Sequence, residues 1–447
     1  MSLFQNEDFR HLMDTLPANV ERRVKAGDIT GALRLIDGYL SAGAQPELAP
    51  RLRAERVRLS RLENDFPLTR EEAIAQVRAE WPEFTEEQFD ALVDNRRIDW
   101  RYVNGRVQYH DRFLSCVRIY AEKEAPGLKP ETVDHTRRDE MLARMEREGG
   151  LTARITLKAS IRAAKGAKGK KVQAWLPIPA DCPQQSEVEI LDATPGYVLA
   201  PADSTARTIY WESSERDSFE VTYRYQHHAA YVDPYTLKCD QVQPTFDTQE
   251  ELPHIAFTPY LRELCERITK GCKTPVEKAG AIYDYVTGNV DYRYQPAYVL
   301  LDNIADSCAK ELRGDCGVMA LLFITLCRIA GVPARWQSGL HATPDDSGAH
   351  DWAMFYIAPY GWLYADPSFG SGARRNGEVS RRKHYFGNLD PCRMVANSVF
   401  QAPLTPPDPC YRNDPYDNQL GEMTIDGEGL WGENVERNVE TVEFQFL

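Results

Sequence analysis

The stretch RGDCGVMALLFITLCRIAGVPARW, residues 313–336, decides the fold of the chain. After its cysteine, apolar side chains surround the axis of a helix, which is typical of a helix buried on nearly all faces. Gly331 stands where helices commonly end in a left-handed residue, and Pro333 prevents continuation. The sequence therefore predicts a central buried helix whose first turn contains Cys316.

Cys316 has two interpretations. Cysteine is often a small buried core residue, and for a lone cysteine that explanation would prevail. In the first turn of a helix, however, unpaired N–H groups and the helix dipole favour a negative charge. We therefore expect a thiol with a lowered pKa, an effect that Asp315 opposes unless its carboxylate caps the helix.

A histidine and an aspartate follow in the stretch GAHDWAMFYIAPYGWLYADPSFG, residues 348–370. His350 opens one apolar strand, a turn follows at residues 358–360, and the return strand ends at Asp366. Folding this hairpin brings His350 toward Asp366, and Pro367 ends the strand at that carboxylate. Asp366 can then accept from one imidazole nitrogen and leave the other for the cysteine.

The order Cys, His, Asp resembles the transglutaminase-like superfamily of papain-type cysteine enzymes, including bacterial members. The residues that carry the resemblance are GDCGVMALLFITLCRIAGVPARWQSG, HDWAMFYI and WLYADPSFG, preceded by VDYRYQP at 290–296. The resemblance spans roughly Pro259 to Gly370 and implies Cys316 as nucleophile, His350 as general base and acid, and Asp366 as the group that orients the histidine.

One departure concerns the oxyanion. Animal transglutaminases use an upstream tryptophan to bind it, but this chain has no tryptophan between Trp211 and Trp336. The backbone N–H of Cys316 can supply one donor, and the candidates for the second are Gln295 and Tyr294, with Gln295 preferred. The missing tryptophan favours hydrolysis over protein crosslinking.

Other chemistry-bearing residues have plainer explanations. Cys308 and Cys327 are expected to fill core space. His341, placed by the sequence in a loop, is a rival base. A zinc site from Cys308, Cys316, His341 and His350 is conceivable, but no close pair among them has ligand spacing. We therefore expect no metal and no cofactor.

Composition limits the partners. The chain has 447 residues, a net charge of -14 and ten cysteines without a CxxC pair. Such an acidic surface repels phosphate backbones, so no nucleic-acid partner is expected. The first residues lack the apolar core of a signal peptide, and no apolar run reaches bilayer length, so we expect no membrane association and a cytoplasmic location.

The expected fold class is α+β, in three parts. Residues 1–150 read as a mostly helical domain with one helical hairpin and a winged-helix-like segment, whose hairpin turns at Asn104-Gly105. Residues 151–245 alternate as an antiparallel β-sandwich. Residues 246–447 are expected to form the transglutaminase-like catalytic domain, a central helix packed on an antiparallel sheet, with a C-terminal tail wrapped around it.

These features predict a cysteine peptidase or amidase that cleaves a peptide or carboxamide bond of a peptide or protein through a thioester. Two alternatives stay open. The same triad can transfer the acyl group to an amine, as a transglutaminase does. The core can also be a non-catalytic scaffold that binds peptides or proteins, and the N-terminal helical region is a candidate site for a protein partner in either case.

Overall fold

The computed structural model describes residues 6–130, 136–167 and 169–447. They form two compact units. One combines Thr136–Tyr292 with Ile304–Leu447, and the other combines residues 7–130 with Arg293–Asn303. No helix within these described ranges is long and apolar enough to cross a bilayer. The three-part division expected from the sequence stays a prediction.

The unit that contains residues 7–130 is mainly helical. Thr69 and Thr85 each begin a helix with a reciprocal capping box. The next hairpin turns at Asn104-Gly105, where both residues have positive φ, so that prediction is confirmed. The elements of this part of the chain are η1 (Asn6–His11), α1 (Ala18–Lys25), α2 (Ile29–Ser41), α3 (Ala49–Asp65), α4 (Arg70–Glu80), α5 (Glu86–Asp94), β1 (Trp100–Val103), β2 (Arg106–Tyr109), α6 (Phe113–Arg118), α7 (Ala121–Glu124) and η3 (Tyr298–Leu300).

Within the larger unit, two sheets form a sandwich. Their strand orders are β18-β3-β8-β5 and β17-β16-β4-β7-β6. Buried and exposed residues alternate along β3 and β8, as expected for strands with one face on a core. The elements are α8 (Thr136–Glu148), β3 (Gly150–Ala163), β4 (Val172–Pro177), β5 (Gln185–Ala193), β6 (Val198–Leu199), β7 (Thr208–Ser213), β8 (Ser218–Ala230), β16 (Glu422–Ile425), β17 (Glu428–Gly429), η4 (Gly432–Asn434) and β18 (Val435–Phe446).

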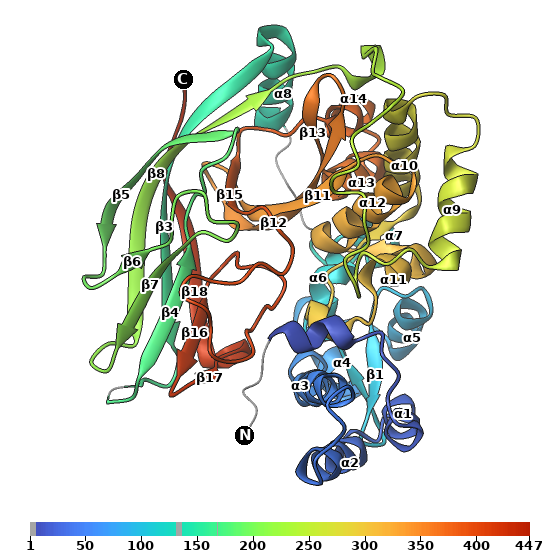
Figure 1. Ribbon diagram of the computed structural model, residues 1–447. Helices are drawn as coiled ribbons and strands as arrows, with labels where there is room; N and C mark the ends of the chain where they lie inside the picture. Colours follow the sequence, from blue (N-terminus) through green and yellow to red (C-terminus); the bar gives the residue numbers. More distant parts are fainter. Residues whose placement is uncertain (1–5, 131–135, 168) are drawn as a thin grey trace. The chain divides into compact units, whose positions relative to one another are not determined.

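The last strands come from residues that the sequence analysis assigned to a wrapping tail. Strand β18 pairs with β3 along nearly its whole length, and β16 pairs with β4, as the red and green ribbons of Figure 1 show. The alternation of apolar and charged residues in VERNVETVEFQF favours such a strand. The C-terminus therefore completes both sheets of the sandwich.

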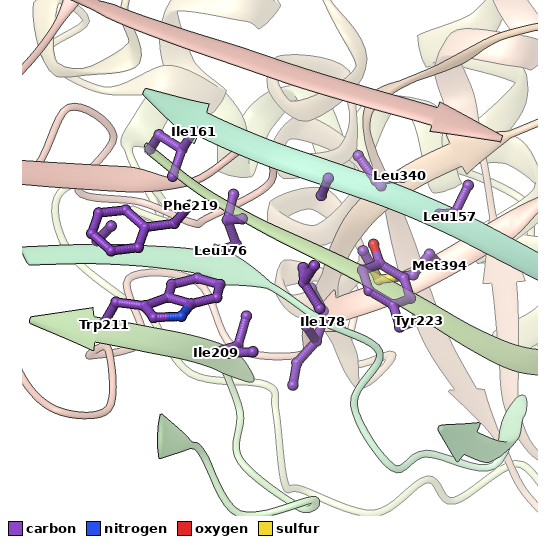
Figure 2. Close-up of a cluster of buried hydrophobic side chains, with 14 of the residues drawn as sticks. Leu157, Ile161, Leu176, Ile178, Ile209, Trp211, Phe219, Tyr223, Leu340 and Met394 are labelled. Carbon is purple, nitrogen blue, oxygen red and sulfur yellow. The ribbon is translucent and has the colours of Figure 1, made fainter. Parts of the chain in front are cut away.

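The sandwich core extends to a further, five-stranded sheet formed within residues 334–397. Figure 2 shows Leu340 and Met394, from this five-stranded sheet, in one buried cluster with sandwich residues such as Leu157 and Tyr223. Shared burial of this kind is the main source of stability between packed layers. The five-stranded sheet is therefore held on one side by the sandwich within the same compact unit.

Helix α12 (Cys316–Ile329) is the buried helix that packs against the five-stranded sheet of residues 334–397. Nearly all of its residues after Cys316 are buried, and Asp315 caps it by accepting a hydrogen bond from the N–H of Val318 at 3.2 Å. Gly331 follows the helix with a φ of 77°, so the predicted start and end are both confirmed.

The five-stranded sheet has the order β14-β13-β12-β11-β15 and is antiparallel. Helix α12 packs against β11 and β12. The hairpin that the sequence predicted between His350 and Asp366 corresponds to β12 and β13, so it is confirmed. The elements of this part are η2 (Pro234–Thr236), α9 (Pro259–Thr269), α10 (Pro275–Asn289), β9 (Asp291–Tyr292), α11 (Ile304–Glu311), β10 (Arg313–Gly314), β11 (Ala334–Ala342), β12 (Ser347–Ile357), β13 (Gly361–Ala365), α13 (Pro367–Arg375), α14 (Val379–His384), β14 (Phe386–Gly387) and β15 (Arg393–Asn397).

Candidate active site

The β12–β13 hairpin brings His350 and Asp366 together. In this hairpin, Ala353 of β12 pairs with Ala365 of β13. His350 lies three residues before Ala353, and Asp366 directly follows Ala365, so the two residues lie at the same end of the hairpin. His350 Nε2 lies 2.7 Å from Asp366 Oδ2, and both side chains are buried. The sequence predicted this juxtaposition from the hairpin, and the geometry agrees with it.

Asp366 is fixed by more than the histidine. It is the N-cap of α13, so its Oδ1 accepts the N–H of Phe369 at 2.9 Å and the hydroxyl of Ser368 at 2.8 Å. This leaves Oδ2 for His350. The sequence expected Pro367 merely to end the strand, whereas here the proline occupies the first turn of a helix that Asp366 caps.

An arginine far along the chain meets the same carboxylate. Arg393 Nη1 lies 3.0 Å from Asp366 Oδ2, and its Nη2 lies 2.7 Å from Asp390 Oδ2. Arg393 is fully buried. A buried charge of this kind is tolerated because it is paired on two sides. Nothing near residue 393 in the sequence signals this contact.

Aromatic rings fix the plane of the imidazole. The ring of Phe369 lies over His350 with centroids 4.5 Å apart and an angle of 34° between the planes, and the ring of Trp352 lies 6.0 Å away. The hydrogen bond and the ring contacts together restrict the histidine to one orientation, with Nε2 on Asp366 and Nδ1 free of that bond.

The charges of this pair follow from their surroundings. Burial disfavours the ionised form of Asp366, but His350 and Arg393 outweigh it and lower its pKa to about 2. Burial lowers the pKa of His350, against the opposing effect of Asp366, and Arg393 lowers it further. The pair therefore rests as a carboxylate and a neutral imidazole at neutral pH.

Cys316 is the first residue of α12 and is partly exposed. Its thiol donates to Asp351 Oδ2 at 3.3 Å. Burial raises the pKa of this thiol well above its ordinary value, and the acidic side chains of Asp351 and Asp315 add to the effect. The expectation of a lowered thiol pKa was therefore wrong, because burial, together with the carboxyl groups beside the sulfur, outweighs the helix dipole.

The two oxyanion candidates belong to the other compact unit. Gln295 Nε2 donates to the backbone carbonyl of Arg293 at 3.1 Å, and the ring of Tyr294 faces the guanidinium of Arg112. The role of Gln295 as second oxyanion donor stays a prediction.

The rival base has another partner. His341 lies in β11 rather than in the expected loop, and its Nε2 is 3.6 Å from Asp390 Oδ1. The loop assignment was wrong because the strand continues to Ala342. Its ring centroid is 6.0 Å from that of His350, so it borders the site without forming the pair with Asp366.

The ligand atoms of His341, Asp390 and Cys392 lie within 4.8 Å of one another in the described part of the chain. Asp390, however, already accepts from Arg393 at 2.7 Å, from the Tyr385 hydroxyl at 3.0 Å and from the N–H of Cys392 at 2.9 Å. The arginine charge beside this carboxylate opposes a cation. The group therefore fits a buried ion-pair network better than a metal centre.

The two cysteines that the sequence predicted to fill core space are buried. Cys308 lies in α11 and Cys327 in α12, and neither has an exposed sulfur to offer a ligand. The prediction that they fill core space is confirmed.

Sequence reasoning missed two further residues at the site. Gln419 Nε2 donates to the backbone carbonyl of His350 at 2.9 Å and to Asp351 Oδ1 at 2.6 Å. Asp351 is visible in the sequence beside His350, but strand alternation cannot tell which group it meets. Gln419 follows about seventy residues later in an irregular segment, where no periodic signal exists.

The segment that contains the candidate site is similar to a known protein family. The model of the transglutaminase-like superfamily matches residues 262–367. No curated protein matches the chain. A candidate cysteine protease from Cytophaga hutchinsonii is 15% identical, with 66% of this chain and 91% of that chain covered at a TM-score of 0.43. The periplasmic domain of TgpA from Pseudomonas aeruginosa is also 15% identical, with 54% and 96% covered at a TM-score of 0.28.

The family match contains Cys316, His350 and Asp366, and its span agrees with the segment that the sequence motifs delimited. The segment that contains these three residues therefore matches the transglutaminase-like superfamily.

Proposed function

We propose that the protein is a cysteine hydrolase that cleaves a peptide or carboxamide bond, with Cys316 as nucleophile, His350 as base and acid, and Asp366 as the orienting group. The observation that carries the proposal is the buried His350–Asp366 pair at 2.7 Å beside a helix that begins with cysteine. This arrangement provides a nucleophile, a base and a group that holds the base in one orientation, which are the parts that nucleophilic catalysis requires.

Acylation begins with a turn of the thiol from Asp351 toward His350. Nδ1 takes the proton from Sγ, and the sulfur attacks the carbonyl carbon to form a C–S bond. The backbone N–H of Cys316 is suited to stabilise the oxyanion, and Gln295 is the proposed second donor. The C–N bond then breaks as the imidazolium gives its proton to the leaving nitrogen. The product of this half-reaction is a thioester on Cys316.

Deacylation reverses the roles. His350 takes a proton from water, the hydroxide adds to the thioester, and the C–S bond breaks. The sulfur recovers the proton from the imidazolium, and a carboxylic acid is released. If an amine replaces water, the same steps give a new amide, which is the acyl-transfer alternative. The choice depends on how far water is excluded from the acyl-enzyme.

A peptide mixture that includes glutamine side chains tests the proposal. Wild-type protein and Cys316→Ala are incubated with it in the presence of a primary amine, and the products are identified by mass spectrometry. New carboxylates that depend on Cys316 support hydrolysis, and Cys316-dependent amine adducts support transfer. Saturable peptide binding without any product, unchanged in Cys316→Ala, would contradict an enzyme and favour the scaffold.

The helical unit has a proposed role of its own. Its α2–α3 hairpin is of a kind that binds peptides or partner helices, so we propose that it contributes to recognition of a protein partner. Acidic residues begin α5 where a DNA-recognition helix would be basic, which supports a protein partner over nucleic acid. The cytoplasm is the proposed location.

A further inference from the structure

The side chain that contacts the nucleophilic sulfur is Asp351, which the proposed mechanism does not use. Cys316 donates its thiol hydrogen to Asp351 Oδ2 at 3.3 Å, and Gln419 Nε2 donates to Oδ1 at 2.6 Å. Asp351 is only 4% exposed. A buried carboxyl in contact with a reacting atom can change that atom's chemistry directly.

Resting on the proposed role of Cys316 as nucleophile, we propose that Asp351 is a further residue of the active site, whose carboxyl group, when ionised, keeps the proton on the nucleophilic sulfur. Thiolate formation beside a carboxylate places two negative charges in contact, which is unfavourable at low dielectric. When Asp351 is neutral, that repulsion vanishes. His350 can then take the thiol proton without opposition from a neighbouring charge.

The neighbours of Asp351 decide when it ionises. Burial raises the pKa of Asp351 well above its usual range, and two carboxyl groups add to this: Asp417, from the C-terminal segment, and Asp315, from the start of α12. Gln419 supplies a neutral N–H, and Cys316 is a further titratable neighbour. Burial and the two carboxyl groups therefore make Asp351 keep its proton to a higher pH than an exposed aspartate does.

Asp417 affects the pH at which Asp351 ionises. It is buried, and burial together with Asp414 raises its pKa to about 7, against Ser338 and Arg412, which lower it. As Asp417 ionises, its charge makes the proton on Asp351 harder to remove. Removing the Asp417 carboxyl should therefore let Asp351 ionise at lower pH and protect the thiol more strongly.

This logic gives two variants with opposite effects. Asp351→Asn removes the carboxylate and keeps the shape, so Cys316 should react faster with iodoacetamide at pH 8, by about tenfold for one unit of thiol pKa. Asp417→Asn should make the same cysteine react more slowly than in the wild type. Rates are measured at Cys316 itself by mass spectrometry of its peptide, with Cys272, which is partly exposed, as an internal reference.

The matched control is Asp345→Asn, which removes an equal charge from an exposed residue that pairs with Arg137. It should leave the Cys316 rate unchanged. The proposal is overturned if Asp351→Asn reacts at the wild-type rate or more slowly, or if both active-site variants change in the same direction. If Asp351→Asn does not fold, the direction of the Asp417→Asn change decides alone.

Alkylation needs no substrate, so this test is separate from that of the proposed function. Opposite changes in a protein that cleaves no peptide would support the role of Asp351 and contradict only the hydrolase. Peptide cleavage that depends on Cys316, with no change in Asp351→Asn, would contradict only the role of Asp351.

Discussion

At the scale of single residues, the reactivity of Cys316 is decided by the groups that its side chain meets. The helix dipole alone favours a thiolate, yet Asp351 and Asp315 raise the pKa of the thiol. Asp366 shows the opposite case, because the hydrogen bond with His350 and the charge of Arg393 keep its carboxylate ionised despite burial. The thiol and the imidazole are consequently both neutral at rest, so the proposed mechanism transfers the proton to His350 during attack and does not start from an ion pair.

The first prediction concerns Asp366. Asp366→Asn keeps the size of the side chain but presents an amide to His350, which favours the wrong tautomer. We expect Cys316-dependent cleavage to fall by about three to four orders of magnitude, measured as kcat/KM. Ser368→Ala, which removes only one of the other hydrogen bonds to Asp366, is the control and should change the rate by less than about tenfold. A variant Asp366→Asn with more than a third of wild-type activity would contradict the role of Asp366.

At the scale of elements, the site combines helices and strands that the local sequence pattern predicts with segments that no local pattern predicts. Helix α12 and the β12–β13 hairpin follow from apolar spacing, Gly331 and the turn before Gly361, so these elements and the His350–Asp366 pair could be predicted. Arg393 and Gln419 reach the site from segments whose placement depends on sheet order and on irregular backbone. Periodicity does not encode such long-range contacts, which explains why those residues were missed.

A second prediction concerns the start of α12. Asp315→Ala removes the cap of the helix and should lower the free energy of unfolding by about 1 kcal/mol. It also removes one of the acidic groups that raise the thiol pKa, so alkylation of Cys316 should become faster.

The comparison for this variant is Thr274→Ala, which removes the cap of α10. Urea unfolding should show a similar loss of stability, with no change in the alkylation of Cys316. Equal acceleration of alkylation in both variants would mean that loosened structure, and not the charge of Asp315, affects the thiol.

At the scale of the whole molecule, the C-terminal segment joins the two layers of the larger unit. It supplies Asp417 and Gln419 beside the site and then continues into β16 and β18 of the sandwich. The alternation of β18 could have been recognised in the sequence. The sharing of one core by Leu340, Met394 and the sandwich could not, because it depends on how two sheets pack face to face.

A third prediction follows from acids buried in this segment. Burial raises the pKa of Glu422 to about 7, against Arg412 and Arg437. A carboxyl whose pKa is raised on folding binds its proton more tightly in the folded state than in the unfolded chain. As pH rises, the unfolded chain loses this proton first, so the free energy of unfolding falls between the pKa of the unfolded chain and about 7. Glu422→Gln should therefore reduce the fall in unfolding free energy between pH 5 and pH 8, by on the order of 3 kcal/mol.

Urea unfolding at the two pH values measures this difference. Glu428→Gln, on the exposed end of β17, is the control and should leave the pH dependence unchanged. If the unfolding free energy of Glu422→Gln depends on pH as that of the wild type does, the pKa of Glu422 is not raised in the folded protein. Arg412 and Arg437 then offset the effect of burial on this carboxyl.

The central claim is that Cys316 is a nucleophile driven by His350. Capture of a peptidyl chloromethyl ketone tests it most directly, because the thiolate displaces chloride to form a stable thioether, and an activated thiol does so faster than an ordinary one. Intact-mass and peptide mass spectrometry should find one equivalent on Cys316 in the wild type, none in Cys316→Ala, and a much slower capture in His350→Ala with the fold retained. Capture spread over several cysteines, or equal rates with and without His350, would contradict the account.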